Sequence, residues 1–239
     1  MSEKALSIQS LSVKYGFHVA VEGLSLGLLR GESLGLLGTN GAGKTSTIRA
    51  ILGMVSYRGE IEVFGHAVSG WKIFKRLGFA PEEALPPDYL DGREYLSFVA
   101  GFRDLDREKR NAEVSKWLDL FELSPKKKIR DYSKGMKKKI VLAQAFLANP
   151  DFLILDEPLN GLDPMMIMKL RDVISTYRGQ GGTVLYCSHI LSEVEKTCSH
   201  AAILKNGKLV LNMSIPEISR EFGGVEKAFA KTAAETRDE

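Results

Sequence analysis

The sequence has few cysteines, no long apolar run and little net charge, and each of these absences narrows what the chain can be. Cys187 and Cys198 are too few for a disulfide framework, and no Cys/His cluster has the spacing of metal ligands. We therefore expect two reduced, buried thiols. Charged residues interrupt every apolar stretch well before the roughly 18 residues that a membrane span needs. Any membrane role would come through a partner.

Other absences concern targeting and composition. Residues 1–5 contain no basic region that leads into an apolar segment, so we expect no secretion signal and a cytosolic location. A formal net charge of +3 is too small by itself to indicate a nucleic-acid partner. The sequence contains no internal repeat and no low-complexity linker. Its 239 residues, 44% of them hydrophobic, fit one large α/β domain or a core with a subdomain.

The most informative segment is Gly-Thr-Asn-Gly-Ala-Gly-Lys-Thr at residues 38–45, which directly follows the apolar run at residues 33–37. Strand, Gly-rich loop and helix in this order form a phosphate cradle, because successive backbone N–H groups converge on an anion near a helix N-terminus. Lys44 would reach the β- and γ-phosphates, and the Thr45 hydroxyl would coordinate Mg²⁺. A simple turn would not require Gly-Lys-Thr at the helix start. The predicted polyphosphate-binding residues are Gly38, Thr39, Asn40, Gly41, Ala42, Gly43, Lys44, Thr45 and Ser46.

Hydrophobic periodicity predicts a βαβ core that is interrupted by a helical insert. Strands are expected at residues 6–13, 24–30, 33–37, 59–65, 76–80, 152–155 and 183–187, with a hairpin of 201–205 and 208–212 around Asn206-Gly207. Helices are expected over residues 44–54 and 164–177, and the pattern is helical throughout residues 92–149. The polar segment 232–239 is expected to fray.

Two adjacent carboxylates follow the apolar strand at residues 152–155. Asp156 and Glu157 would lie at the edge where the strands of doubly wound sheets bind ligands. We assign Asp156 to Mg²⁺ and Glu157 to the attacking water, whose proton it would accept or which it would orient. The alternative is that these acids only end the strand before a proline turn. That arrangement is common for one acid, but much less common for two adjacent acids in a chain that also has a phosphate loop.

Two further features allow more than one interpretation. Ser133 and Gly135, in Tyr-Ser-Lys-Gly-Met before an amphipathic helix, could present backbone N–H groups to an anion, but alone they indicate only a helix N-cap. The lysines at 126–128 and 137–139 could contact acidic lipid headgroups or nucleic acid. A solvated helix face is the favoured interpretation.

The order of these motifs, continued by Gly161-Leu162-Asp163 and by Ser188-His189 at a strand end, closely resembles the ATP-binding cassette (ABC) family of ATPases over nearly the entire chain. The resemblance implies ATP and Mg²⁺ as ligands. It also implies an α/β fold: a P-loop NTPase (RecA-like) core with an N-terminal antiparallel β subdomain and an inserted α-helical subdomain. Residues 1–84 and 150–239 would form the nucleotide-binding core, and residues 85–149 the helical subdomain with the signature motif.

The same resemblance assigns roles to residues that spacing alone leaves open. Ser133 and Gly135 would contact the γ-phosphate of ATP held by a partner subunit, although Lys134 and Met136 depart from the commonest signature. Asp163 would belong to the loop that couples the two sites. His189 would be a catalytic histidine that donates to the γ-phosphate and positions the attacking water, beside Glu157 and Lys44.

Two residues of the nucleotide site have open alternatives. Tyr15 lies about 23 residues before the phosphate loop, where the family places a ring that stacks on adenine; a strand-end core tyrosine is the alternative. Glu82 stands where the family usually has a Gln that touches Mg²⁺. An ionised Glu can ligate the metal but cannot donate a hydrogen bond, and the alternative is that it faces solvent.

The resemblance implies an ATP-hydrolysing subunit whose paired, ATP-bound closure drives a separate transmembrane permease of the exporter type. It would act at the cytoplasmic face of the membrane, as a homodimer or as a heterodimer with a related cassette, and no nucleic-acid partner is expected. The alternatives are a cassette ATPase that acts on the ribosome or DNA, and a nucleotide switch with negligible turnover. Lys44, Asp156, Glu157 and His189 are all present, which argues against a dead site.

Overall fold

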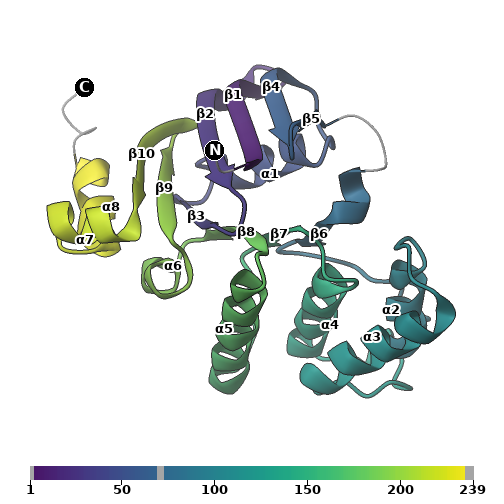
Figure 1. Cartoon of the computed structure of the whole chain (residues 1–239). Coiled ribbons are helices and arrows are strands. Elements are labelled where there is room, and N and C mark those ends of the chain that lie inside the picture. Colours follow the sequence, from purple (N-terminus) through teal and green to yellow (C-terminus); the bar gives the residue numbers. More distant parts are fainter. Residues whose placement is uncertain (1–2, 69–72, 235–239) are drawn as a thin grey trace.

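The computed structural model describes residues 3–68 and 73–234 (Figure 1). Its strands are β1 (Lys4–Tyr15), β2 (His18–Leu29), β3 (Ser33–Leu37), β4 (Tyr57–Val63), β5 (His66–Ala67), β6 (Leu77–Ala80), β7 (Phe152–Asp156), β8 (Thr183–Ser188), β9 (His200–Lys205) and β10 (Lys208–Ser214). They form an antiparallel sheet of order β2-β1-β4-β5 and a six-stranded sheet of order β10-β9-β3-β8-β7-β6. In the larger sheet only β10 runs antiparallel to its neighbour.

The helices lie around the larger sheet (Figure 1). They are α1 (Lys44–Ile51), α2 (Gly92–Ala100), α3 (Arg107–Leu120), α4 (Lys134–Phe146), α5 (Pro164–Gly179), α6 (Leu191–Thr197), α7 (Ile215–Phe222) and α8 (Val225–Ala234), with 3₁₀ turns at Ile73–Arg76 and Ile129–Asp131. Helices α2, α3 and α4 gather at one end of the molecule, and α7 and α8 at the other, with α1, α5 and α6 between the two ends. Among the described residues, no helix combines the length and the apolar character that crossing a bilayer requires.

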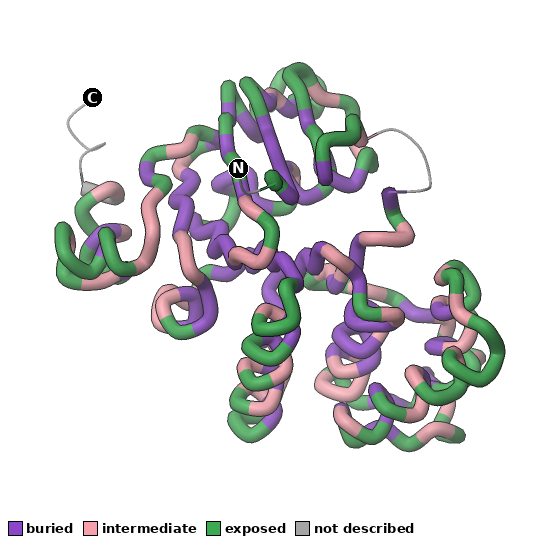
Figure 2. Tube along the Cα trace, in the orientation of Figure 1, coloured by how far each residue is buried: buried purple, intermediate pink, exposed green. Residues whose placement is uncertain are grey.

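The larger sheet separates two apolar cores, as the alternation of side chains along a strand requires. In β7, Phe152 and Ile154 belong to the core shared with α1 and the antiparallel sheet, whereas Leu153 and Leu155 belong to the core shared with α4 and α5. Strands β3, β7 and β8 of this sheet are accordingly buried along their whole length (Figure 2). Helix α1 thus packs between the two sheets, and the phosphate loop before it is anchored by the fully buried strand β3.

Helix starts follow from local capping chemistry. Asp91 and Glu94 form a capping box at α2, and Ser214 and Glu217 form another at α7. Asp163 caps α5 by accepting from the Met166 backbone N–H at 2.9 Å, with a proline in the first turn. These caps fix where each helix leaves its loop.

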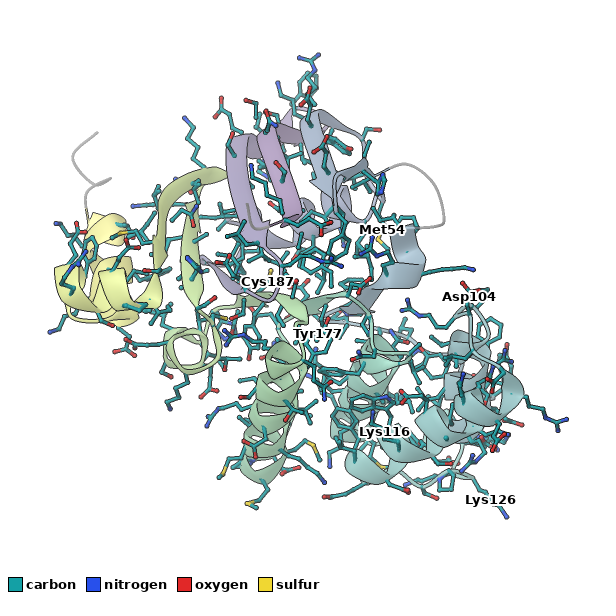
Figure 3. The ribbon with its side chains drawn as sticks, in the orientation of Figure 1. Met54, Asp104, Lys116, Lys126, Tyr177 and Cys187 are labelled. Carbon is teal, nitrogen blue, oxygen red and sulfur yellow. The ribbon has the colours of Figure 1, made fainter. Side chains whose placement is uncertain are left out.

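The expected fold class is confirmed: an α/β core with an N-terminal antiparallel sheet and inserted helices. Both cysteines are buried and unpaired, as expected, and Cys187 lies in β8, within the larger sheet (Figure 3). The hairpin around Asn206-Gly207 is also present.

Some boundaries differ from expectation for local reasons. The segment 92–149 is not helical throughout but forms three helices, and α4 ends before Ala148 and Asn149, which both have positive φ (61° and 46°). Strand β2 begins at His18, because β1 and β2 form one long hairpin.

The helices after β8 were not predicted, although the Ser214–Glu217 box and the proline that follows Ile215 are recognisable start signals. Part of the segment expected to fray, residues 232–234, lies in α8, and residues 235–239 lie outside the described part of the chain.

Candidate active site

The carboxyl ends of the parallel strands β3, β6 and β7 meet at one edge of the larger sheet, where such sheets bind ligands. A cavity of about 310 Å³ opens there. Its lining combines the phosphate loop, both acids after β7 and residues of the β1–β2 hairpin. The lining residues are Tyr15, His18, Ala20, Asn40, Gly41, Ala42, Gly43, Lys44, Thr45, Ser46, Glu82, Asp156 and Glu157.

The phosphate loop is shaped by backbone that only glycine accepts easily. Gly43, at the N-cap of α1, has a φ of 107°, and a Cβ there would lie 2.6 Å from the Ala20 carbonyl oxygen. Lys44 is 7% exposed, and its ammonium donates back to the Gly38 carbonyl at 2.7 Å and the Thr39 carbonyl at 3.3 Å. The lysine is therefore folded over its own loop, within reach of an anion that binds the cradle.

Asp156 lies beside the loop and is poor in partners. The Thr45 hydroxyl donates to its Oδ2 at 3.4 Å, while its Oδ1 is buried without any hydrogen-bond partner. Burial, followed by the nearby Glu82 and Glu157 carboxylates, raises the pKa of Asp156 to about 6. Three carboxylates thus concentrate negative charge beside the phosphate loop, and Lys138 and Lys44 offset part of it.

These residues fit Mg²⁺. A hydroxyl and carboxylate oxygens are hard ligands of the kind that this ion prefers, and Mg²⁺ is commonly held by one or two carboxylates together with substrate phosphates and water. The orphaned Asp156 Oδ1 and the adjacent Thr45 Oγ1 are the groups that would hold it.

Glu157 is held in place by its backbone and by β8. Its φ of 43° lies in the left-handed region, and its N–H donates to the Cys187 carbonyl at 2.9 Å. The carboxylate is nearly buried; Ser188 donates to Oε2 at 3.4 Å, and His189 Nδ1 lies 2.9 Å from the same oxygen. His189 does not line the cavity itself, but it contacts Glu157, which does.

Tyr15 and Glu82 both reach the cavity. Tyr15 is 41% exposed at the end of β1, so its ring is not a core residue. Glu82 is exposed at the end of β6, and its Oε1 accepts from the Asn160 side-chain amide at 3.2 Å. Glu82 is thus exposed to solvent and also lines the mouth of the cavity.

Ser133 and Gly135 do not line the cavity in this chain. The Ser133 hydroxyl accepts from the Met136 backbone N–H at 3.2 Å and caps α4. A Cβ on Gly135 would lie 2.9 Å from the Gly161 carbonyl oxygen, so the start of α4 packs closely on the loop that precedes α5. One protomer therefore does not bring these two residues to its own phosphate loop.

The favoured interpretation of residues 137–139 as a solvated helix face is wrong for two of the three lysines. Lys138 is 6% exposed, and the Lys139 side chain is 14% exposed and pairs with Asp163 at 3.7 Å. Both are covered because α4 packs on β6 and β7. Lys126, in contrast, is exposed at the outer edge of the helical group (Figure 3).

Sequence reasoning missed four residues of this region: His18, Ala20, Lys138 and Asn160. The first two enter the site only because the β1–β2 hairpin folds over the loop. Lys138 had a signal, since it precedes the apolar positions 141 and 142 by three and four residues and so lies on the buried face of α4. Asn160 had none.

Comparison with known proteins agrees with this geometry. Residues 21–160 match the family described as ABC transporter. An uncharacterised ABC transporter ATP-binding protein of Nostoc is 38% identical over 84% of this chain, and the chain spans 61% of that protein. The linearmycin resistance ATP-binding protein of Bacillus subtilis is 34% identical over 92% of this chain and 72% of its own length.

Two further likenesses cover almost the whole chain. The daunorubicin resistance ATP-binding protein of Streptomyces coeruleorubidus is 31% identical over 94% of this chain and 72% of its own length. A solved structure of the ATP-binding subunit of an ABC transporter superposes with a TM-score of 0.89, at 28% identity, over 96% of this chain and 99% of that one.

Proposed function

The chain belongs to the ABC transporter ATP-binding family, and from this premise we propose that it binds and hydrolyses ATP to drive a separate transmembrane permease. One observation carries the proposal: the phosphate loop, Asp156 and Glu157 line the same cavity, and His189 contacts the Glu157 carboxylate. No observation favours a ribosome- or DNA-directed ATPase or an inactive switch.

The phosphate loop binds the triphosphate in this proposal. Backbone N–H groups of the loop and the N-terminus of α1 face the anion, and Lys44 exchanges its two carbonyl partners for β- and γ-phosphate oxygens. Thr45 and Asp156, with Glu82 at the cavity mouth, would hold Mg²⁺, which would supply positive charge against the phosphates. Tyr15 stacks on the adenine ring at the mouth of the cavity.

Glu157 serves as the base that accepts a proton from the attacking water or orients it. It is suited to this role because two backbone features and two side chains fix its carboxylate: the left-handed φ, the bond to the Cys187 carbonyl, Ser188 and His189. A positioned base of this kind contributes a factor of about 10² to 10⁴ in rate.

A second cassette completes the site. Ser133 and Gly135 start α4 outside their own cavity, and we assign them to the γ-phosphate of ATP bound by a partner, which is a copy of this chain or a related cassette. Residues 1–84 and 150–239 then act as the nucleotide-binding core and residues 85–149 as the moving helical subdomain. Hydrolysis removes the contacts that hold the pair closed.

The permease would dock on the loop after β6 and on α4. A second cavity of about 610 Å³ is lined there by Glu82, Glu83, Ala84, Leu85, Lys134, Lys137, Lys138, Val141 and Asn160. Leu85 is 95% exposed and Tyr89 69% exposed beside it, which is the apolar character expected of a contact surface. The chain would therefore sit at the cytoplasmic face of the membrane, and the two resistance proteins among its relatives favour export.

Phosphate release by the purified chain with ATP and Mg²⁺ tests the proposal. Glu157→Gln should lower turnover by about 10² or more while ATP still binds, and should form a stable ATP-bound dimer. Glu60→Gln, on the exposed face of β4, is the matched control and should keep full turnover. Equal phosphate release by Glu157→Gln and the unmodified chain would refute the assignment, as would an absence of release from both.

A further inference from the structure

Lys138 is a buried cation that the proposed mechanism leaves unexplained. It is 6% exposed, in the first half of α4, among apolar residues such as Val141 and Leu142. Lysine is almost never buried in this way unless its ammonium is fully partnered. Its partners therefore indicate what the residue does.

The ammonium joins three segments that are distant in sequence. Lys138 Nζ donates to the carbonyl oxygens of Pro81 at 3.2 Å, Glu82 at 3.3 Å and Asp156 at 3.3 Å. An ammonium has three donors, so all of them are used on backbone atoms at the ends of β6 and β7. One side chain of α4 thus fixes the loop of Glu82 against the strand end that carries the acid pair.

The charges around Lys138 are mostly negative. The Asp156, Glu82 and Glu157 carboxylates are close enough to the ammonium to oppose the lowering of its pKa by burial, which brings it to about 8. Glu82 and Lys138 also line one cavity. The Asn160 amide is a neutral partner of the Glu82 carboxylate, and Lys44 is the other cation close to Asp156. Three carboxylates and two ammonium groups therefore lie in this region, and Lys138, which is bonded to the Glu82 backbone, is the cation beside the Glu82 loop.

We propose that Lys138 is a positioning residue that supplies the counter-charge for Glu82 and ties the start of α4 to the ends of β6 and β7. Because α4 begins directly after Ser133, the link makes the position of Ser133 and Gly135 depend on the loop of Glu82. The inference rests on the proposed ATPase function.

The test uses Lys138→Gln, which keeps N–H donors without the charge, and Lys138→Met, which removes both. Each is made alone and together with Glu82→Gln. Lys109→Met, on the surface of α3 and with a side chain that is 74% exposed, is the control. Removal of a buried charge can lower stability because its partners are left uncompensated, so thermal unfolding is measured for each variant to separate a loss of turnover from a loss of folded protein.

We expect both Lys138 variants to lower kcat by about tenfold or more while the Kd for ATP changes by less than about threefold, because the residue positions groups and does not touch nucleotide. Glu82→Gln should reduce that loss by at least about threefold, since the counter-charge is then no longer needed. Lys109→Met should keep kcat within about twofold. Unchanged kcat in Lys138→Met, or the same fold loss in both Glu82 backgrounds, would overturn the inference.

A second readout does not depend on turnover. In urea unfolding without nucleotide, Lys138→Met should change the unfolding equilibrium constant at least about threefold less when Glu82 is already Gln. Equal changes in both backgrounds would overturn the pairing of Lys138 with Glu82. If the proposed ATPase function is wrong, the unmodified chain should release no phosphate, but the coupling of Lys138 and Glu82 in urea unfolding should persist. The failure of the function and the failure of this inference are therefore distinguishable.

Discussion

His189 Nδ1 lies 2.9 Å from Glu157 Oε2, which joins the residues that follow β7 and β8. The glutamate side chain is 6% exposed and the histidine side chain 53% exposed, so the pair has one buried and one accessible member. A neutral imidazole that donates from Nδ1 can only accept at its other nitrogen. For His189 to donate to a γ-phosphate while it keeps Glu157, its ring must be protonated.

The first prediction concerns this pair. His189→Ala should lower ATP turnover by about 10² or more, because Glu157 loses a partner and the terminal phosphate loses a donor. ATP affinity, measured by titration of a fluorescent analogue, should stay within about threefold. His200→Ala, in β9 and outside the nucleotide cavity, serves as the control. A parallel loss of binding and turnover in His189→Ala would contradict the catalytic role.

Tyr15 provides a prediction on binding alone. Tyr15→Ala should raise the Kd for ATP by about 5- to 100-fold, since stacking of a base on an aromatic ring contributes about 1 to 3 kcal/mol. Tyr15→Trp keeps an aromatic face and should stay close to the unmodified chain. Phe17→Ala removes a fully exposed ring from the same hairpin, 107% exposed, and is the control. If Tyr15→Ala binds ATP normally, the ring has no contact with adenine.

Glu82 gives a prediction on metal dependence. If its carboxylate lies close enough to Mg²⁺ to contact it, Glu82→Gln should shift the Mg²⁺ concentration required for half-maximal ATPase activity, because an amide oxygen carries no net charge. The measurement is a Mg²⁺ titration at saturating ATP. Glu83→Gln, exposed at the next position, should leave the titration unchanged. An unchanged Mg²⁺ requirement in Glu82→Gln would place its carboxylate away from the metal.

Asp156 links stability to pH. Its pKa is about 6 in the fold and 3.8 as a reference value, so between those values the folded chain binds a proton that the unfolded chain has lost. Its contribution therefore falls as the pH rises through this window, by on the order of 3 kcal/mol. Asp156→Asn should stabilise the nucleotide-free, Mg²⁺-free chain more at about pH 7.5 than at about pH 4.5.

Urea unfolding of Asp156→Asn and the unmodified chain at both pH values measures this effect. Asp172→Asn, exposed on α5, is the control and should show no such difference. A gain in Asp156→Asn that does not vary with pH would mean that the acid cluster is not electrostatically strained.

Arg171 and Glu193 connect the helix after the Asp163 loop to the helix after His189. The guanidinium Nε and Nη2 each lie 2.7 Å from a Glu193 oxygen, and the glutamate side chain is 10% exposed. Arg171→Met should lower the free energy of unfolding by about 1 to 3 kcal/mol, because it leaves a nearly buried carboxylate with only a longer contact to Lys196, at 3.9 Å.

The double variant Arg171→Met with Glu193→Met should cost less than the sum of the two single changes, since no buried charge remains. Lys169, on the same helix as Arg171, forms an exposed pair with Glu122. Lys169→Met should therefore lower the free energy of unfolding by less than about 1 kcal/mol. Additive single costs would show that the guanidinium and the carboxylate do not depend on each other.

Much of the site follows from the sequence because its parts are contiguous. The phosphate loop from Gly38 to Thr45 consists of consecutive backbone groups between a strand and a helix, and Asp156 and Glu157 stand at the end of a strand whose apolar run is evident. Glycines, a lysine and carboxylates in that arrangement suit a polyphosphate and its metal ion far better than they suit a plain turn. Local order therefore predicted the ligand class and the core strands.

Tertiary structure decided the rest, and Lys137 and Lys138 show why. The two lysines are neighbours in one basic run, yet only Lys138 is buried and bonded to the ends of β6 and β7. Likewise, the Glu82–Asn160 bond depends on β6 lying beside β7, a neighbour 75 residues away in register at Leu77 and Phe152. Such contacts depend on the order of strands in the sheet, and the free energy that selects that order comes from burial on both faces of the sheet, which no short stretch of sequence contains.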